Sequence, residues 1–324
     1  MSVNHNSNSA NLQNKKIAVI GIGGVGGYLA GMLASRYPHV TFAARGKRLE
    51  SIKKHGLTLH SDYHGKITAV PEHVVPVEEL EEQDCIFVCV KNYSLEEVCR
   101  SMKHAVSDHT LIIPVMNGVD PGDRVRSILT KGTVIDSLIY IIAFANPDFS
   151  ISQQGSFAQL YLGIRDADCA QREAVNEAVS ILAGADIDCK AAEDIEQAIW
   201  KKYILNCAYN VTTACYDNTI GQIRNDPVKA GEYEALVKEA YQVALARHVH
   251  ITQEHIDSII HRFYYEYADN ATSSLQRDVR AGKTNELETF SGYLVREAAR
   301  LGVPVPVSER MYQILKEQTQ SHIL

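Results

Sequence analysis

The stretch KKIAVIGIGGVGGYLAGMLA, residues 15–34, constrains the fold more than any other part of this chain. The apolar run Ile17–Ile20 is typical of a buried parallel strand. From Val25 onward, apolar residues recur at helical spacing, and the pattern stops near Pro38. Several glycines lie between the two patterns, although glycine loses more entropy on folding than other residues. The sequence therefore predicts a strand, a tight glycine turn and a helix.

Three of these glycines have the spacing of a phosphate-binding turn. Gly21, Gly23 and Gly26 match GxGxxG, in which the first permits the turn, the second admits a pyrophosphate and the third lets helix and strand pack closely. Free N–H groups at the start of the helix would then hold the phosphates. We therefore expect a bound dinucleotide; a glycine turn without a ligand is the alternative. The expected contacts are Gly21, Ile22, Gly23, Gly24, Val25 and Gly26. The additional glycines, Gly24 and Gly27, are expected to permit closer contact with the cofactor or the helix.

The end of the second strand, residues 40–44, indicates which dinucleotide binds. It reads FAARGKR and lacks the Asp or Glu that accepts the ribose 2′-hydroxyl in NAD-binding folds. Arg45 instead offers a guanidinium that can grip a 2′-phosphate with two hydrogen bonds. This pattern favours NADP(H), and a solvated basic loop is the alternative.

Further strands end in polar residues. A helix is expected over 47–55, and buried strands are expected over 85–90 and 111–115. Ligands bind beyond the carboxyl ends of the strands in an open parallel sheet. Arg45, Lys91 and Asn117 would therefore share one edge with the glycine turn. Taken alone, Lys91 fits an ordinary surface lysine equally well.

The second part of the chain has a different pattern. From about residue 190 the sequence reads as helices, and a chain of 324 residues is long enough for two domains. We predict an α/β fold in which a Rossmann-type dinucleotide-binding domain, 15–190, is followed by an all-helical domain, 191–324. The polar residues 1–14 read as a disordered lead-in. A cleft between the two domains would hold a small substrate.

Composition argues against several classes of function. The net charge of −7 gives no reason to expect nucleic-acid binding, and no apolar run approaches the roughly 18 residues of a membrane span. The seven scattered cysteines suggest free thiols in a reducing cytoplasm. His248 and His250 alternate with apolar residues in a strand-like pattern, so we expect no metal site.

Candidate catalytic residues lie in the helical part. Lys202, Asn206 and Asn210 recur at i+4 and line one face of a helix that is otherwise largely apolar. Such groups need partners if they are buried, and a polar substrate would supply them. A partly exposed polar stripe is the alternative.

A second candidate segment follows in SSLQRDVRAGKTNE. Ser274 lies on a predicted helix that Gly282 ends, and a new helix is expected to start at Thr284 or Asn285. Glu286 would then lie in the first turn, where a carboxylate interacts favourably with the helix dipole. A plain capping role is the alternative for Glu286.

From Lys16 onward the chain resembles the ketopantoate reductases (2-dehydropantoate 2-reductases). The shared marks are the glycine turn, AARG, Lys91, the NG at Asn117, WKKYILNC and SSLQRDVRAGKTNE. The resemblance implies that Lys202 is the catalytic lysine and that Glu286 is the active-site glutamate. It further implies substrate contacts from Asn206, Asn210 and Ser274, and cofactor contacts from Arg45, Lys91 and Asn117.

The activity implied by the resemblance is NADPH-dependent reduction of 2-dehydropantoate to pantoate, in the biosynthesis of pantothenate and coenzyme A. Lys202 would donate the proton. We expect a cytoplasmic enzyme whose partner is a small 2-keto acid, and a homodimer is the candidate assembly. The motif departs from the family's around Glu286, with Ser291 preceding Gly292. A reductase of another small 2-keto acid or ketone therefore remains an alternative, as does a non-catalytic NADP(H) sensor.

Overall fold

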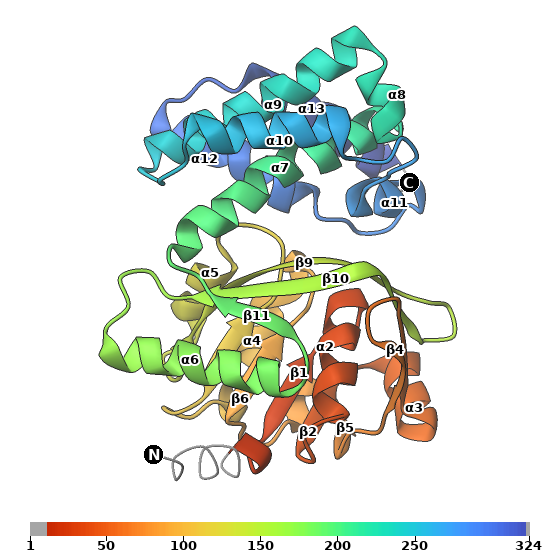
Figure 1. The fold of residues 1–324 in the computed structure, drawn as a ribbon, viewed down its shortest axis with the longest axis vertical. Helices are drawn as coiled ribbons and strands as arrows, with labels where there is room; N and C mark the ends of the chain where they lie inside the picture. Colours follow the sequence, from red (N-terminus) through yellow and green to blue (C-terminus); the bar gives the residue numbers. More distant parts are fainter. Residues whose placement is uncertain (1–11, 322–324) are drawn as a thin grey trace. The chain divides into compact units, whose positions relative to one another are not determined.

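The computed structural model describes residues 12–321 and divides the chain into two compact units, Met1–Ile195 and Glu196–Leu324. The first unit contains two sheets with helices, and the second is helical (Figure 1). The predicted fold class is thus confirmed. Most of the expected disordered lead-in, 1–14, lies outside the described residues.

The N-terminal unit is built on a six-stranded parallel sheet in the order β5-β2-β1-β6-β7-β8. In that order the strands are His73–Val75, Val40–Ala43, Ile17–Ile20, Cys85–Val88, Leu111–Pro114 and Thr133–Val134. Ile17 pairs with Val40 on one side and with Cys85 on the other. The chain therefore reverses its direction across the sheet between β1 and β6, the place where such sheets bind ligands.

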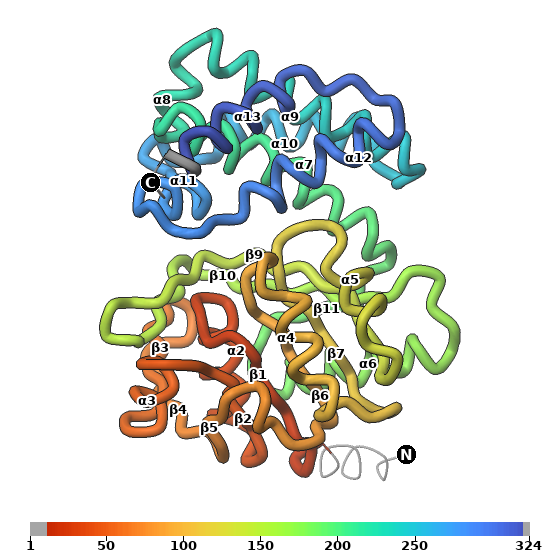
Figure 2. The backbone as a smooth tube through the Cα atoms, turned by 180° about the vertical axis from the view of Figure 1, so that it is seen from behind, coloured from red at the N-terminus to blue at the C-terminus, as the bar shows by residue number. Residues whose placement is uncertain are grey.

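Helices cover both faces of this sheet, and alternate residues of β1 belong to two different cores. Ile17 and Val19 pack in a cluster with α2 and α6, whereas Ala18 and Ile20 pack in a second cluster with α4 and α5. The backbone of these helices around the sheet can be followed in Figure 2. Burial on both faces explains why β1 is apolar throughout. The helices of this unit are α2 (Gly24–Ala34), α3 (Gly46–His55), α4 (Leu95–Ser101), α5 (Pro121–Ile128) and α6 (Cys169–Gly184). Short 3-10 turns are Val77–Glu79, Asn92–Ser94 and Lys103–Ala105.

A second, five-stranded sheet was not predicted from the sequence. Its strands are β3 (Leu57–Ser61), β4 (Gly65–Ala69), β9 (Asp136–Ala145), β10 (Ile151–Gly163) and β11 (Asp188–Ala191). The order is β11-β10-β3-β4, with β9 antiparallel to β10. Helix α2 contacts strands of both sheets and lies beneath the β9–β10 hairpin in Figure 1. This position explains why α2 is apolar all round.

The C-terminal unit is a set of packed helices. They are α7 (Ile195–Tyr216), α8 (Ile220–Arg224), α9 (Pro227–Ala246), α10 (Gln253–Tyr265), α11 (Ser274–Arg280), α12 (Tyr293–Leu301) and α13 (Pro306–Ser321), with a π-helical turn at Glu288–Gly292. Asp226 accepts from the N–H groups of Val228 and Lys229 and so begins α9. Tyr233 stacks on Phe263 at 3.9 Å between ring centroids and joins α9 to α10.

The prediction of a strand around His248 is wrong. His248 follows the end of α9 with φ of +62°, and residues 247–252 contain no strand. The neighbouring Val249 and Ile251 are buried while both histidines are exposed, so the alternation reflects an irregular connection packed on the core. Across residues 12–321, no cluster of His, Cys, Asp or Glu has an arrangement suited to a metal.

All seven cysteines are free. Within the described part of the chain, no helix combines the length and the apolar character needed to span a membrane.

Candidate active site

The three glycines of the GxGxxG pattern differ in what surrounds them. Gly21 follows β1 with φ of +89°, a left-handed backbone that favours glycine. A Cβ on Gly26 would overlap the carbonyl oxygen of Gly21, so the turn packs closely there. At Gly23, by contrast, a Cβ would have no protein atom within 4 Å. The open space at Gly23 is what a pyrophosphate approaching the backbone requires.

The start of α2 suits an anion. Gly23 is the residue that precedes the helix, and the first turn, which contains Val25, carries no acidic side chain. The first N–H groups of a helix lack intrahelical acceptors, and the helix dipole adds positive potential there. The residues present therefore fit the diphosphate of a dinucleotide.

Gly24 and Gly27 have a different role from the other glycines. A Cβ on Gly24 would overlap the backbone of Ala143 in β9, and a Cβ on Gly27 would overlap the side chain of Ile151 in β10. Both glycines therefore allow the second sheet to approach α2. The packing of α2 accounts for both glycines, and the predicted contact between Gly24 and the cofactor stays a prediction.

Arg45 stands two residues beyond β2, where α3 begins, and its side chain is exposed. Its neighbour Arg48 donates to the carbonyl of Phe149 at 3.3 Å and lies over that ring. Among residues 12–321, no carboxylate forms an ion pair with Arg45. Its guanidinium is therefore available to a phosphate.

Lys91 and Asn117 follow β6 and β7, each three residues beyond the strand, because the strands end earlier than the sequence suggested. Asn92, which the sequence did not single out, connects the two loops. Its buried side-chain amide donates to the carbonyl of Asn117 at 2.8 Å. Arg124 donates to the side-chain oxygen of Asn92 at 2.9 Å and to its carbonyl at 2.7 Å. No sequence pattern separates Asn92 from an ordinary loop asparagine.

In the C-terminal unit, the structure brings Asn206, Asn210 and Ser274 together. Asn210 is buried, and its side-chain oxygen accepts from the Ser274 hydroxyl at 3.2 Å and from the N–H of Leu275 at 3.4 Å. Its amide nitrogen donates to the side-chain oxygen of Asn206 at 3.3 Å. The polar face of α7 is thus joined to the start of α11, and the amides are ordered by protein contacts.

Lys202 and Glu286 interact electrostatically. Burial lowers the pKa of Lys202 from its ordinary 10.5 to about 8, and the carboxylate of Glu286 raises it against that effect. Glu286 is only 5% exposed. A partly buried lysine with a lowered pKa that interacts with a buried carboxylate is typical of a site that transfers protons.

Glu286 lies just before a helix, whereas the sequence predicted it inside the first helical turn. The helical residues begin at Leu287, whose N–H donates to the side-chain oxygen of Asn285 at 3.0 Å. The carbonyl of Glu286 accepts from the N–H of Thr289 at 3.0 Å. Asn285 supplies the side-chain oxygen that accepts at the helix start. A helix-capping role for the Glu286 carboxylate, the alternative that the sequence left open, is therefore less favoured.

Comparison with known proteins identifies the family. The family model "Ketopantoate reductase PanE/ApbA" matches residues 17–167, and the model of its C-terminal part, "Ketopantoate reductase PanE/ApbA C terminal", matches residues 194–319. The chain belongs to the ketopantoate reductase family. It is an oxidoreductase, and the family uses NAD(P)H, which confirms the predicted cofactor class.

Individual relatives of this ketopantoate reductase family member are distant in sequence. It is 28% identical to the uncharacterized oxidoreductase YkpB of Bacillus subtilis, over 93% of this chain and 98% of that protein. The crystal structure of 2-dehydropantoate 2-reductase from Porphyromonas gingivalis is 27% identical with a TM-score of 0.78, over 94% and 100% of the two chains. A ternary structure of D-mandelate dehydrogenase with NADH and anilino(oxo)acetate, 18% identical, shares the fold with a TM-score of 0.85 over 95% and 99%.

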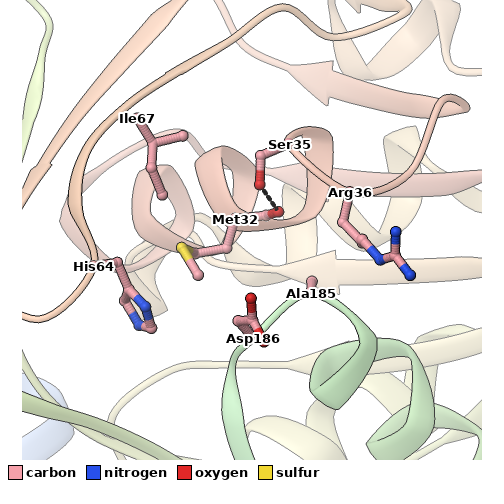
Figure 3. A pocket seen from close by; sticks show the side chains of 7 residues that line it. All are labelled: Met32, Ser35, Arg36, His64, Ile67, Ala185 and Asp186. Atoms are coloured by element: carbon pink, nitrogen blue, oxygen red, sulfur yellow. Dashed lines mark hydrogen bonds between the residues drawn. The ribbon is translucent and has the colours of Figure 1, made fainter.

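A separate hollow of about 200 Å³ lies in the N-terminal unit (Figure 3). Its lining residues are Met32, Ser35, Arg36, His64, Ile67, Ala185 and Asp186. Met32 lies in the last turn of α2, and Ser35 directly follows the helix, whereas the glycine turn lies at the opposite end, before the first turn of α2. Since a helix rises about 1.5 Å per residue, the length of α2 separates this hollow from the phosphate-binding end. It is not part of the candidate active site.

Proposed function

We propose that this family member reduces 2-dehydropantoate to pantoate with NADPH, and so contributes to the biosynthesis of pantothenate and coenzyme A. The observation that carries the proposal is the pairing of Lys202 with Glu286 in the C-terminal unit. Asn206 and Asn210 on α7, with Ser274 of α11 bonded to Asn210, support it with hydroxyl and amide groups suited to a hydroxylated keto acid.

Lys202 acts as the proton donor in this proposal. Bound NADPH would supply the hydride that reduces the keto carbon. Charge then develops on the carbonyl oxygen, where the Lys202 ammonium stabilises it and transfers its proton. A pKa of about 8 keeps the ammonium populated at neutral pH and makes it a stronger acid than an ordinary lysine.

Glu286 has two roles in the proposal. Its carboxylate raises the pKa of Lys202, which maintains the protonated form despite burial. It also orients Lys202 or accepts a hydrogen bond from the substrate hydroxyl. The pair argues against a non-catalytic sensor, because the binding of a dinucleotide by itself requires no general acid.

Arg45 supports the choice of NADPH over NADH. Its exposed guanidinium follows β2, where an NAD-binding fold carries an acidic residue. The fold alone does not decide this choice, since the D-mandelate dehydrogenase structure with the same fold holds NADH.

The assay that tests the proposal follows NADPH oxidation with 2-dehydropantoate and with a panel of other small 2-keto acids. We expect kcat/KM for 2-dehydropantoate to exceed that for the other acids by about tenfold or more, since a site that hydrogen-bonds a substrate hydroxyl disfavours analogues without it. Preference for another acid would assign that substrate instead. NADPH binding without turnover of any acid would support the sensor. The homodimer remains a prediction, which light scattering checks.

A further inference from the structure

The helix that follows Glu286 is wound in an unusual way. Residues Glu288–Gly292 form a π-helical turn before the regular helix α12 begins. Such turns are rare, and they occur frequently at functional sites because they change the direction of nearby side chains. Thr289 and Phe290, inside the turn, are buried at 8% and 1% exposure. Their carbonyls therefore depend on protein donors rather than water.

Tyr203 supplies a donor to this turn. Its hydroxyl lies 3.0 Å from the carbonyl oxygen of Thr289 and 3.1 Å from that of Phe290, and it donates between them. The thiol of Cys207, one helical turn along α7, donates to the Phe290 carbonyl at 3.2 Å. Two side chains of α7 are thus bonded to the π-helical turn.

The ring of Tyr203 is itself fixed. It is 2% exposed and makes edge-to-face contacts with Trp200 at 5.4 Å and with Tyr293 at 5.9 Å between centroids. Such aromatic pairs restrict the orientation of the ring. The hydroxyl therefore reaches the two carbonyls from a rigid support.

These contacts lie directly beside the catalytic pair in the chain. Tyr203 immediately follows Lys202 on α7, and Thr289 donates its N–H to the carbonyl of Glu286 at 3.0 Å. The N–H of Phe290 donates to the same carbonyl at 3.2 Å. A bonded path therefore runs from the residue after Lys202, through the π-helical turn, to the backbone of Glu286.

We propose that Tyr203 is a positioning residue that holds the π-helical turn and thereby sets Glu286 against Lys202. This inference rests on the proposed function for its catalytic consequence. Without the hydroxyl, two buried carbonyls lose a donor, which favours rewinding of the turn toward a regular helix. Rewinding changes the helical register at the start of the segment and moves Glu286 relative to α7.

The test compares Tyr203→Phe with Tyr233→Phe. Both tyrosines are buried in the C-terminal unit, but the Tyr233 hydroxyl makes no hydrogen bond within the described residues. The Phe variants keep the rings, so Tyr233→Phe controls for the loss of a buried hydroxyl. The first measurement is kcat and its pH dependence with the best keto acid at saturating NADPH. The second is the pKa of Lys202 by lysine-selective NMR, with Lys202→Ala to assign the signal.

We expect Tyr203→Phe to lower kcat by about 10- to 100-fold, the range expected for a small misplacement of catalytic groups. Because burial lowers the pKa of Lys202 and the carboxylate of Glu286 raises it, displacement of Glu286 should move that pKa further below 8. The alkaline limb of kcat should move to lower pH with it. The NADPH affinity of Tyr203→Phe should stay at the wild-type value. Tyr233→Phe should show no change in kcat, in its pH profile or in the pKa of Lys202.

Two results would overturn the inference. One is a Lys202 pKa in Tyr203→Phe equal to that of the wild type. The other is a loss of kcat that follows only the loss of folded protein, without a shift in the pH profile. A wild-type protein that turns over no keto acid would instead refute the proposed function, while the NMR measurement still decides whether Tyr203 positions Glu286.

Discussion

The side-chain amide of Asn92 donates to the backbone carbonyl of Asn117 across two loops of the central sheet, at 2.8 Å. These loops follow β6 and β7 and carry Lys91 and Asn117, which we propose contact the cofactor. Asn92 is buried, and Arg124 holds its oxygen and carbonyl. The positions of the two loops that we propose contact the cofactor therefore depend on Asn92, which is not itself expected to contact it.

Replacing Asn92 with Asp tests this dependence. The new carboxylate keeps an acceptor for Arg124 but places an oxygen against the carbonyl of Asn117, which loses its donor. We expect NADPH affinity to fall by about tenfold, equivalent to about 1.4 kcal/mol, the range of one hydrogen bond. Fluorescence titration measures it, and kcat at saturating NADPH should remain close to that of the wild type. Unchanged affinity would show that the two loops hold their positions without this bond.

The same substitution at two glycines should give opposite results. Gly23→Val places its side chain in open space and should leave the protein folded while abolishing NADPH binding. Gly26→Val would overlap the Gly21 carbonyl and should destabilise the fold by about 1–3 kcal/mol or more. Thermal denaturation and fluorescence titration separate the two effects. Undiminished NADPH affinity in Gly23→Val would mean that the glycine serves backbone geometry alone.

Arg45→Ala should weaken NADPH binding by about 1.5–3 kcal/mol, the loss expected when a charged hydrogen bond to phosphate is removed. NADH binding should hardly change, because NADH has no 2′-phosphate. Arg48→Ala is the matched control, since the Arg48 side chain is already bonded to Phe149. Isothermal titration with both cofactors gives the affinity ratios. A wild-type protein that binds NADH as tightly as NADPH contradicts the account of Arg45.

The pH profile of kcat should report Lys202. Burial lowers the pKa of Lys202 to about 8 in the folded protein, although the carboxylate of Glu286 raises it. This pKa sets the pH at which the proton donor is lost. Since the ammonium is the active form, kcat should be level below that pH and should fall as the pH rises through it. Glu286→Gln removes the carboxylate that raises the pKa, so the fall should begin at lower pH. A profile that stays level to pH 10 in the wild type would exclude Lys202 as the acid.

Residues with local signals were predictable from the sequence. The strands Ile17–Ile20 and Cys85–Val88 are buried on both faces and therefore appear as apolar runs. The second sheet was missed because, although its hairpins β3–β4 and β9–β10 are local, the pairing that joins them is distant. Ile151 of β10 pairs with Leu59 of β3, and no local pattern specifies that partner. Gly24 and Gly27 were left ambiguous for the same reason, since the strands they contact were not foreseen.

The candidate site shows the same division. Helical spacing was enough to place Lys202, Asn206 and Asn210 on one face. The π-helical turn was not predictable, because its buried carbonyls are satisfied by Tyr203 from another helix. Asn92 was likewise not predictable, since its role depends on a hydrogen bond to Asn117, 25 residues away in the chain.

Whether Lys202 donates the proton is decided by the kcat of Lys202→Ala. Lys201→Ala is the control, because Lys201 is the adjacent lysine on α7 and points about 100° away around the helix. We predict that Lys202→Ala lowers kcat by about 10²- to 10⁴-fold, the usual contribution of acid–base catalysis, while NADPH affinity and the Lys201→Ala variant remain close to wild type. A Lys202→Ala variant that reduces its best keto acid at the wild-type rate would contradict the account, and another residue would then have to supply the proton.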